Sequence, residues 1–436
     1  MKLGFAEVDI TPSGPMELVG FYRADNKSKG VLKPLLAQAA VWENKERCCL
    51  ITIDSIGFTK ELSDKLRDKT GRLLNVTKEK VMLCFSHTHA APDADMEPEY
   101  YNEICERIES AVLQALKEMT PVTVGWKNAT VHIGVNRRPV SKDTDDRVGI
   151  LKICDADKNA GDTPKLIILR VTAHGNVLKA DNNMISPDYF GDTREIISRK
   201  YGCPVMMIQG AAGSTAPKYF CSENTPVDAR MEECVRSKTA LTDMADSIAD
   251  SISKVFDNME LHNDSSIRMY SKHIELTADV PSVEEAVKVA KDAKELCGII
   301  DTGWMKKVSG LNDEGIHEQS EDVEMQYFSI GDWCLCGGPY EFMVGFALET
   351  EKILGNEFFY LNGYTNGCLL YFPTEDEFDA GGYEVFWSML IYYKYIDRVY
   401  PFRREAASKL IKYVVENLYK EDDANAPFLS ERGKNA

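Results

Sequence analysis

The sequence predicts an α/β fold, because strand-like and helix-like segments alternate along the first part of the chain. Apolar runs at residues 48–53 and 81–85 have the length and composition of buried strands. The polar stretch 60–74 between them suits a helix, and residues 101–119 place apolar side chains at the spacing of an amphipathic helix. This order of strand, helix, strand and helix is typical of an α/β core.

Later segments continue the alternation. We expect further strands at residues 39–42, 166–173, 205–209, 323–336 and 358–361. We expect further helices at residues 193–200, 239–259 and 403–418, and one that opens after Pro281. In the helix after Pro281, Ser282 and Glu285 have the spacing of a capping box.

The length of the chain bounds its organisation. Its 436 residues allow one large domain or two closely packed ones, since single cores stop growing at roughly 250–300 residues. No repeat or low-complexity linker divides the sequence. We expect one domain over residues 1–420, with a soft boundary in the polar stretch 218–238 and a polar tail at 421–436.

Charge and composition exclude several classes of function. A formal net charge of −18 argues against binding to nucleic acid or to an anionic membrane surface. No apolar run approaches the roughly 18 residues of a membrane span, and the N-terminal residues lack the pattern of a signal peptide. We expect a cytoplasmic protein that acts on a small-molecule substrate, and the sequence leaves a homo-oligomer open.

Histidines mark the first candidate site. His87 and His89 follow the strand-like run 81–85, and residues i and i+2 of an extended chain point to the same face. Two imidazoles on one side suit zinc or another divalent cation, whereas the plain alternative is a pair of polar loop residues. His174 ends a third strand-like run, which favours convergence on one point. We expect the remaining histidines, His132, His262, His273 and His317, to be structural or at the surface.

Two further features have open interpretations. Asp54, at the end of the run 48–53, could bind the metal, orient a histidine or cap a turn. The small residues after Gln209, from Gly210 to Gly213, suit either a tight turn or backbone amides that stabilise an oxyanion. The turn is not a phosphate loop, because the Gly-Lys-Ser/Thr ending is missing. It is not a nucleophile elbow either, because Ser214 lacks the Gly-x-Ser-x-Gly frame.

Several segments together resemble the neutral/alkaline, non-lysosomal ceramidase family. Residues 86–92 are similar to its Ser-His-Thr-His-Ser-Gly-Pro motif, and residues 6–12 resemble its Asp-Ile-Thr-Pro opening. Residues 134–139 look like its Asn-Arg motif, and residues 209–217 like its glutamine-containing strand and turn. Tyr371 and Tyr383, twelve positions apart, match two tyrosines of the family. The resemblance spans nearly the whole chain and implies mixed sheets with flanking helices.

The resemblance also implies roles for individual residues. It implies that His87, His174 and Tyr371 bind zinc, with Glu341 as the available carboxylate although it is displaced from the usual register. His89 is then implied as a proton-transfer residue, Arg137 as a contact to substrate or oxyanion, and Tyr383 as a transition-state contact. Gln209, Gly210 and Gly213 are the candidate substrate and oxyanion residues of the turn.

Two departures separate this chain from the family pattern. The resemblance places the nucleophilic serine of ceramidases directly after the glutamine, where this chain has Gly210, and Ser214 stands where the family has aspartate. We therefore expect a zinc-dependent hydrolase of a small soluble amide or ester, with water as the nucleophile. The alternatives are a metal-dependent enzyme acting on a carbohydrate-type substrate and a non-catalytic binding protein with a degenerate site.

Overall fold

The computed structural model describes residues 1–157, 163–219, 236, 239–263, 266–300 and 302–420. Its centre is a mixed sheet of eight strands in the order β4-β3-β2-β1-β5-β7-β8-β9. These strands are β1 (Lys2–Asp9), β2 (Leu36–Glu43), β3 (Arg47–Ile53), β4 (Val81–Phe85), β5 (Thr120–Thr130), β7 (Arg147–Asp155), β8 (Pro164–Val171) and β9 (Val205–Gln209). The outer pairs β3–β4 and β8–β9 are parallel, and the pairs between them are antiparallel.

A second sheet packs on one face of the first. It has four strands in the order β11-β12-β13-β15. They are β11 (Ile267–Asp279), β12 (Glu318–Ile330), β13 (Trp333–Gly337) and β15 (Phe359–Asn362). A buried apolar cluster joins the two sheets, with Trp42 and Leu151 from the larger sheet and Phe328 and Trp333 from the smaller. Such burial of apolar surface between layers is the main stabilising contribution to folding.

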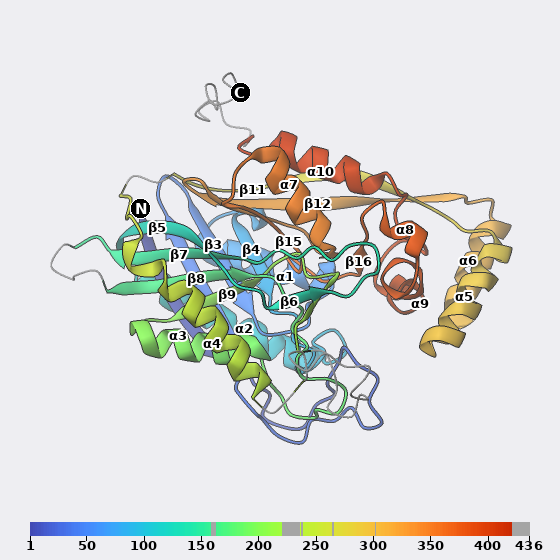
Figure 1. The fold of residues 1–436 in the computed structure, drawn as a ribbon, viewed down its shortest axis with the longest axis horizontal. Coiled ribbons are helices and arrows are strands. Elements are labelled where there is room, and N and C mark those ends of the chain that lie inside the picture. Colours follow the sequence, from blue (N-terminus) through green and yellow to red (C-terminus); the bar gives the residue numbers. More distant parts are fainter. Residues whose placement is uncertain (158–162, 220–235, 237–238, 264–265, 301, 421–436) are drawn as a thin grey trace.

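Helices cover the outer faces of both sheets, so the layers run helix, sheet, sheet, helix (Figure 1). Helices α1 (Lys60–Leu74), α2 (Pro98–Lys117), α3 (Tyr189–Tyr201) and α4 (Ala240–Ser253) pack on the larger sheet. Helices α7 (Val344–Leu354) and α10 (Ala406–Asn417) pack on the smaller sheet. Helices α5 (Val283–Cys297) and α6 (Thr302–Asp313) follow β11 and precede β12 in the chain. They project at one end of the molecule (Figure 1).

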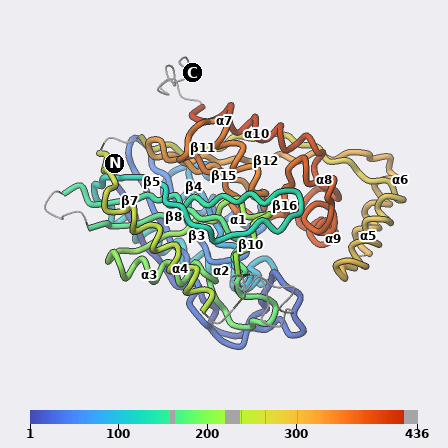
Figure 2. The backbone as a smooth tube through the Cα atoms, in the orientation of Figure 1, coloured from blue at the N-terminus to red at the C-terminus, as the bar shows by residue number. Residues whose placement is uncertain are grey.

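Short elements complete the described part of the chain. They are the strands β6 (Gly134–Asn136), β10 (Thr215–Pro217), β14 (Glu341–Phe342) and β16 (Tyr371–Phe372), the helices α8 (Glu377–Ala380) and α9 (Met389–Tyr392), a π-helical turn (Tyr383–Trp387), and 3₁₀ turns (Lys78–Lys80, Phe256–Asn258, Tyr393–Tyr395). The loop that follows β1 runs beside the loop that precedes α3 (Figure 2), where Leu32 N donates a hydrogen bond of 2.8 Å to Ile185 O. These two loops hold residues that border the candidate site described below.

The two edges of the large sheet approach each other at one place. Strand β4 contacts β9 although they lie at opposite ends of the strand order. The Gln209 side chain, at the end of β9, donates a hydrogen bond of 3.3 Å to Ser86 O, just after β4. The ends of β4, β8 and β9 are thereby brought to one point, which is where the candidate site lies.

Most of the expected elements are confirmed, with corrections at their boundaries. Helix α1, strand β4 and strand β9 have the expected bounds, and α5 begins with the expected capping box of Ser282 and Glu285. The strand expected at 323–336 is wrong as a single element, because Gly331 turns the chain at a φ of 59° and separates β12 from β13. The helix expected at 239–259 ends at Ser253 and is followed by a 3₁₀ turn.

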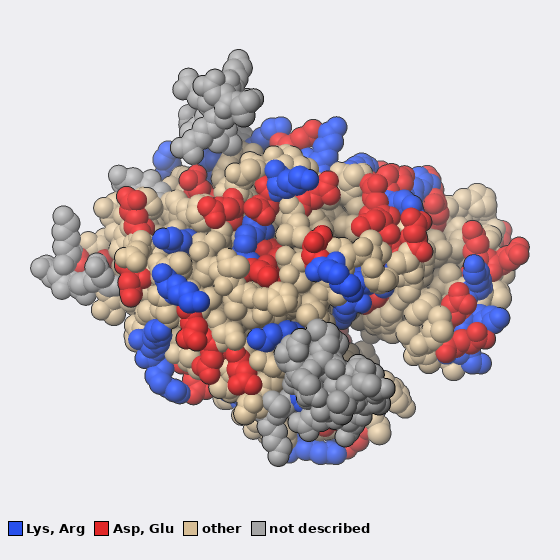
Figure 3. Space-filling view, viewed as in Figure 1, with Lys and Arg blue, Asp and Glu red and all other residues tan. Residues whose placement is uncertain are grey.

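Other expectations concern surface and organisation. The soft boundary at 218–238 and the tail at 421–436 fall largely or wholly outside the described residues, and the single domain over 1–420 stays a prediction. Within the described residues, no helix has both the length and the apolarity to span a bilayer. Acidic and basic side chains are interspersed on the face drawn in Figure 3, without a broad basic patch there.

Candidate metal centre

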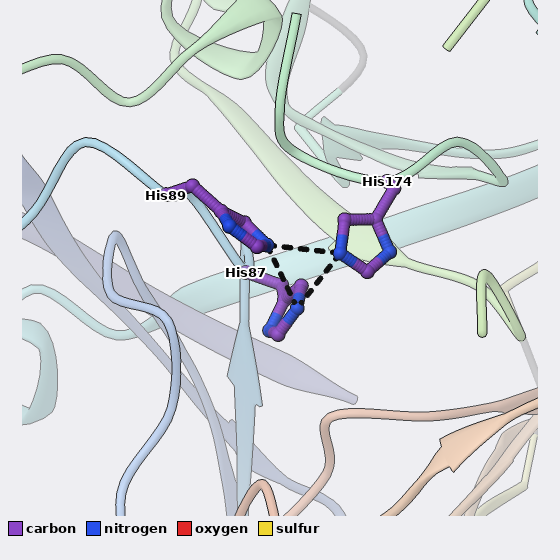
Figure 4. Close-up of side chains that lie close together, drawn as sticks. All are labelled: His87, His89 and His174. Atoms are coloured by element: carbon purple, nitrogen blue, oxygen red, sulfur yellow. Dashed lines mark hydrogen bonds between the residues drawn. The ribbon is translucent and has the colours of Figure 1, made fainter. Parts of the chain in front are cut away.

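Three buried imidazoles converge on one point (Figure 4). His87 and His89 come from the loop after β4, and His174 comes from the loop after β8. The Nε2 atoms of His87 and His174 are 3.1 Å apart, those of His89 and His87 are 3.3 Å apart, and those of His89 and His174 are 2.9 Å apart. Nitrogens on one tetrahedral zinc ion lie about 3.3 Å apart, given metal–nitrogen bonds of about 2.0–2.1 Å. The triangle therefore has the dimensions of a ligand set.

Each imidazole is oriented by a backbone carbonyl. The Nδ1 atoms of His87, His89 and His174 lie 2.7, 3.0 and 3.3 Å from the carbonyl oxygens of Ile56, Gly20 and Ala212, respectively. A carbonyl oxygen only accepts, so each Nδ1 carries the hydrogen and each Nε2 presents its lone pair to the other two. Such hydrogen bonds fix the tautomer and direction of imidazoles that bind metals.

The protonation states fit a cation at this point. Burial lowers the pKa of His89 and of His174 well below the ordinary value of histidine, and electrostatic interaction with the neighbouring His87 lowers both further. These two imidazoles are therefore neutral at pH 7, with lone pairs that face each other in a buried site. A divalent cation at the centre of the triangle satisfies all three lone pairs, so the residues present fit a metal ion.

The backbone reaches this geometry in a way that the strand pattern does not predict. Strand β4 ends at Phe85, and His87 adopts a φ of 57°, in the left-handed region. His87 and His89 therefore converge through a tight turn, and not through the alternation of an extended strand. A residue other than glycine that is held at positive φ is strained by about 1–3 kcal/mol, and such residues are concentrated at functional sites.

Glu341 adds a carboxylate to the cluster. Its Oε2 lies 3.3 Å from His87 Nε2 and 3.9 Å from His174 Nδ1, and its side chain is 2% exposed. Glu341 belongs to β14, and its backbone pairs directly with Tyr371 of β16 in a parallel register. The register that looked displaced in the sequence thus places the carboxylate beside two of the three histidines.

Tyr364 is a site residue that the sequence did not single out. Its hydroxyl donates a hydrogen bond of 3.3 Å to Glu341 Oε2, and its ring centroid lies 4.3 Å from that of His87. Tyr364 also has a φ of 54°, and Phe85 N donates to its carbonyl oxygen at 3.0 Å. The loop after β15 reaches the site through tertiary contacts, which the sequence does not show. The preceding Gly363 indicates only that the chain turns there.

Arg137 connects the turn after β9 to the tyrosines. It donates hydrogen bonds of 2.8 Å to Gly213 O and 3.2 Å to the Tyr371 hydroxyl, and its Nε lies 3.1 Å from Glu384. Burial raises the pKa of Tyr371 well above its ordinary value, and Glu341 raises it further. The Tyr383 ring lies 5.8 Å from that of Tyr371, and burial raises the pKa of Tyr383 to about 12.

The glycine turn after β9 packs closely and does not present the expected amides. Gly210 N donates to Val171 O at 2.7 Å, and Gly213 N donates to Phe342 O at 2.8 Å. These two amides are therefore committed to carbonyl oxygens and are not available to an oxyanion in this conformation. A Cβ at Gly210 would lie 2.2 Å from Thr172 Oγ1, so close packing explains the small residue.

Gln209 and Asp54 hold the loops of the site in place instead of facing its centre. The Gln209 side chain donates to Ala173 O at 2.7 Å and accepts from Ala173 N at 3.3 Å, next to His174. These hydrogen bonds indicate that Gln209 positions the loop at His174 and does not bind substrate directly. Asp54 forms a buried ion pair with Arg194 and accepts a hydrogen bond of 2.9 Å from Leu36 N. Of the three interpretations of Asp54, the structural one matches these contacts.

The other histidines lie away from the cluster. His132 and His273 are exposed and lie 3.0 and 2.8 Å from Asp146 and Asp322. His262 packs its ring against Trp126 at 4.7 Å, and His317 is exposed. All four therefore have the structural or surface setting that the sequence predicts.

Solved structures of ceramidases share this fold. The neutral ceramidase from Pseudomonas aeruginosa superposes with a TM-score of 0.69 at 18% identity, over 98% of this chain and 76% of that chain. A ceramidase complexed with C2 superposes with a TM-score of 0.69 at 16% identity, over 98% of this chain and 77% of that chain. Comparison with protein-family models finds no match, and comparison with curated proteins finds none either. At these identities the likeness establishes a ceramidase-like α/β fold and leaves the activity to the site.

Proposed function

We propose that this chain, which has a ceramidase-like fold, is a zinc-dependent hydrolase of a small soluble amide or ester. The convergence of the His87, His89 and His174 Nε2 atoms within 2.9–3.3 Å of one another is the observation that supports it most strongly. Three lone pairs directed at one buried point repel each other unless a cation lies between them. Protein carboxylates and imidazoles at such a point are typical of catalytic metal sites.

We assign the ion to His87, His174 and Glu341, with Tyr371 as the fourth candidate ligand. Glu341 Oε2 lies 3.3 Å from His87 Nε2, and the backbone pairing of Glu341 with Tyr371 brings the phenol to the same side of the site. Zinc in this position would supply Lewis acidity to a carbonyl oxygen and would acidify a water molecule. Imidazole ligands favour zinc over magnesium, calcium and manganese, whereas copper, iron and nickel suit the same ligand types and are the alternatives to zinc.

We assign proton transfer to His89. Its Nε2 lies 2.9 Å from His174 Nε2, at the edge of the proposed ligand set. Burial lowers the pKa of His89, so the imidazole is neutral and its Nε2 can accept a proton from water. The spacing of the triangle also admits His89 as a third nitrogen ligand, and the zinc content of a His89→Ala variant separates the two assignments.

Arg137 is the group best placed to stabilise negative charge on a carbonyl oxygen. Its guanidinium contacts the Tyr371 hydroxyl at 3.2 Å, and the same side chain is held by Glu384 and Gly213 O. A fixed cation directed at the reacting centre stabilises charge that develops in the transition state. We assign Tyr383, whose ring neighbours Tyr371 and whose pKa is about 12, as a neutral hydroxyl donor to the same oxygen.

Water is the proposed nucleophile. Ser214 and Thr215 are the residues with hydroxyl groups in the turn that follows Gln209. Ser214 Oγ already accepts a hydrogen bond of 3.0 Å from Val344 N, at the start of α7. Gly210 itself has no room for a side chain next to Thr172. In the proposed reaction, the oxygen of water bonds to the carbonyl carbon and the carbon–nitrogen or carbon–oxygen bond breaks. One proton of water leaves with the amine or alcohol, and the acid is the second product.

The test joins metal content to turnover. The purified protein should contain near-stoichiometric zinc and should hydrolyse members of a panel of small amides and esters, whereas a His87→Ala variant should lose both. Full turnover of such a substrate by the metal-free protein would contradict the proposal. Activity on sugars alone would favour the carbohydrate alternative, and absence of metal and of any ligand-induced thermal shift would favour a binding protein.

A further inference from the structure

A cavity of about 340 Å³ opens beside His87 and is bounded entirely by described residues. Its wall combines aromatic rings with carboxylates, and it includes Phe21, Tyr22, Asp93, Asp95, Tyr392 and Tyr395. The loop after β1 contributes the first two residues, and the Phe21 ring packs against the His89 ring at a tilt, with 4.7 Å between centroids. The cavity is therefore continuous with the metal centre, and a bound molecule there would reach His87.

The charged groups of this cavity are all acidic. None of the described residues that line it is lysine or arginine. Asp95 accepts a hydrogen bond of 2.7 Å from Thr59 Oγ1, and Asp93 accepts one of 2.9 Å from Asp95 N. Burial raises the pKa of both carboxyls, and the charge of Asp93 raises that of Asp95 further. Arg23 and Lys179 lie over the Phe21 ring, at 5.5 and 5.8 Å from its centroid. No basic side chain in the described part of the chain forms an ion pair with Asp93 or Asp95, so this side of the cavity is acidic.

The aromatic rings are placed to meet a ligand. Tyr22 is 94% exposed, and Tyr395 is 43% exposed, although both border the cavity. A ligand bound in the cavity would cover these exposed rings, which combine an apolar face with a polar hydroxyl group. A cation over the face of such a ring is attracted by the ring quadrupole, by more when water is excluded. Rings and carboxylates together favour a cationic ligand over a neutral or anionic one.

We infer that the substrate is a small cationic amide or ester, whose ammonium group occupies this cavity while its carbonyl group lies at the metal centre. The inference rests on the proposed hydrolase function and names the class of substrate. The ammonium group would lie between the carboxylates of Asp93 and Asp95 and the rings of Tyr22 and Tyr395. An anionic group such as a phosphate would be repelled by the same carboxylates.

Binding of a matched set of probes tests this inference without turnover. Benzylamine, benzyl alcohol and benzoate have similar size and carry a positive, zero and negative charge at pH 7. Isothermal titration calorimetry at low ionic strength should give about tenfold tighter binding of benzylamine than of benzyl alcohol, and the weakest binding of benzoate. Asp93→Asn and Tyr22→Ala should each reduce the preference for benzylamine. The control Asp246→Asn, which removes an exposed charge from α4, should not.

The outcomes separate this inference from the hydrolase proposal. Equal or tighter binding of benzyl alcohol or benzoate, or an unchanged preference in both Asp93→Asn and Tyr22→Ala, overturns the inference. Zinc content is measured on the same samples. Zinc without a preference for benzylamine would leave the hydrolase proposal standing and remove the cationic substrate. A preference for benzylamine in a protein that binds no zinc would keep the cation site and remove the hydrolase mechanism.

Discussion

Gly20 and His89 are in direct contact at the edge of the metal centre. The Gly20 carbonyl oxygen accepts a hydrogen bond from His89 Nδ1 at 3.0 Å. Gly20 has a φ of 89°, and a Cβ at this position would lie 2.2 Å from the same nitrogen. The loop after β1 thus sets the tautomer of His89 and the place of its ring, and only glycine allows the approach.

A Gly20→Ala substitution tests this contact. The added methyl group would displace His89 and strain the loop, so we expect a loss of about 1–3 kcal/mol in the free energy of unfolding. We also expect zinc affinity or turnover to fall by about 10–100-fold, as for other changes to groups that orient metal-site imidazoles. Urea denaturation and zinc titration measure the two effects. Gly14→Ala is the matched control, since nothing lies within 4 Å of its Cβ position. Equal behaviour of the two variants would contradict the assigned role.

Removal of His89 separates proton transfer from metal binding. The proposed role predicts that His89→Ala retains zinc and loses turnover by about 10²–10⁴-fold, the range for general acid–base groups. Elemental analysis and kcat on the same sample provide the measurement. Loss of zinc from this variant would instead identify His89 as the third nitrogen ligand of the triangle.

Arg137→Lys tests the stabilisation of negative charge. Lysine keeps the charge but cannot contact Gly213 O, the Tyr371 hydroxyl and Glu384 together as the guanidinium does. We expect kcat to fall by about 10²–10³-fold with zinc content unchanged, which is the usual effect of losing one group that stabilises an oxyanion. Arg199→Lys, on the exposed surface of α3, serves as the control. A change in KM alone would assign Arg137 to substrate binding.

Asp145 predicts how stability depends on pH. The carboxylate is 1% exposed and pairs with Arg170 at 2.6 Å and with Arg147 at 2.8 Å. Burial alone raises the pKa of Asp145, but the charges of Arg170 and Arg147 lower it well below the ordinary value. In the unfolded chain the pKa is about 3.9, so the unfolded state binds more protons as the pH falls. The stabilisation is therefore complete above that value and is lost as the pH falls from about 4 towards the folded pKa.

Asp145→Asn should lower the free energy of unfolding by about 3–5 kcal/mol at pH 7, because it leaves buried arginines without their partner. The difference from the wild type should stay constant from pH 7 to about pH 5 and should shrink as the pH falls below about 4, as measured by urea denaturation. Asp143→Asn, at an exposed position two residues away, is the control. A pH-independent difference would contradict the assigned ion pair.

The sequence predicts the regular elements of the fold better than their arrangement. The polar stretch 60–74 forms α1 and the short apolar run 205–209 forms β9, both with the expected bounds. The sequence did not predict β5, because the strand is half-exposed and contains Gly125, which interrupts the pattern of a strand. Gly125 is required there because a Cβ atom would collide with Glu260 O. The contact between β4 and β9 is a tertiary event that periodicity does not encode.

The candidate site was predictable in its histidines and less so in its geometry. His87, His89 and His174 stand at strand ends in the sequence, and the structure brings their Nε2 atoms together. The left-handed turn at His87 and the contact of Tyr364 with Glu341 depend on neighbouring loops. Residue types alone could not show that the amides of Gly210 and Gly213 already donate to carbonyl oxygens.

The central claim is a metal ion at the histidine cluster, and elemental analysis tests it most directly. Purified wild-type protein would be compared with His87→Ala, with His174→Ala and with the control His132→Ala, whose side chain is exposed beside Asp146. We predict near-stoichiometric zinc in the wild type and the control, and loss of zinc in the two cluster variants. A wild-type protein that contains no metal and takes up none on titration would contradict the account.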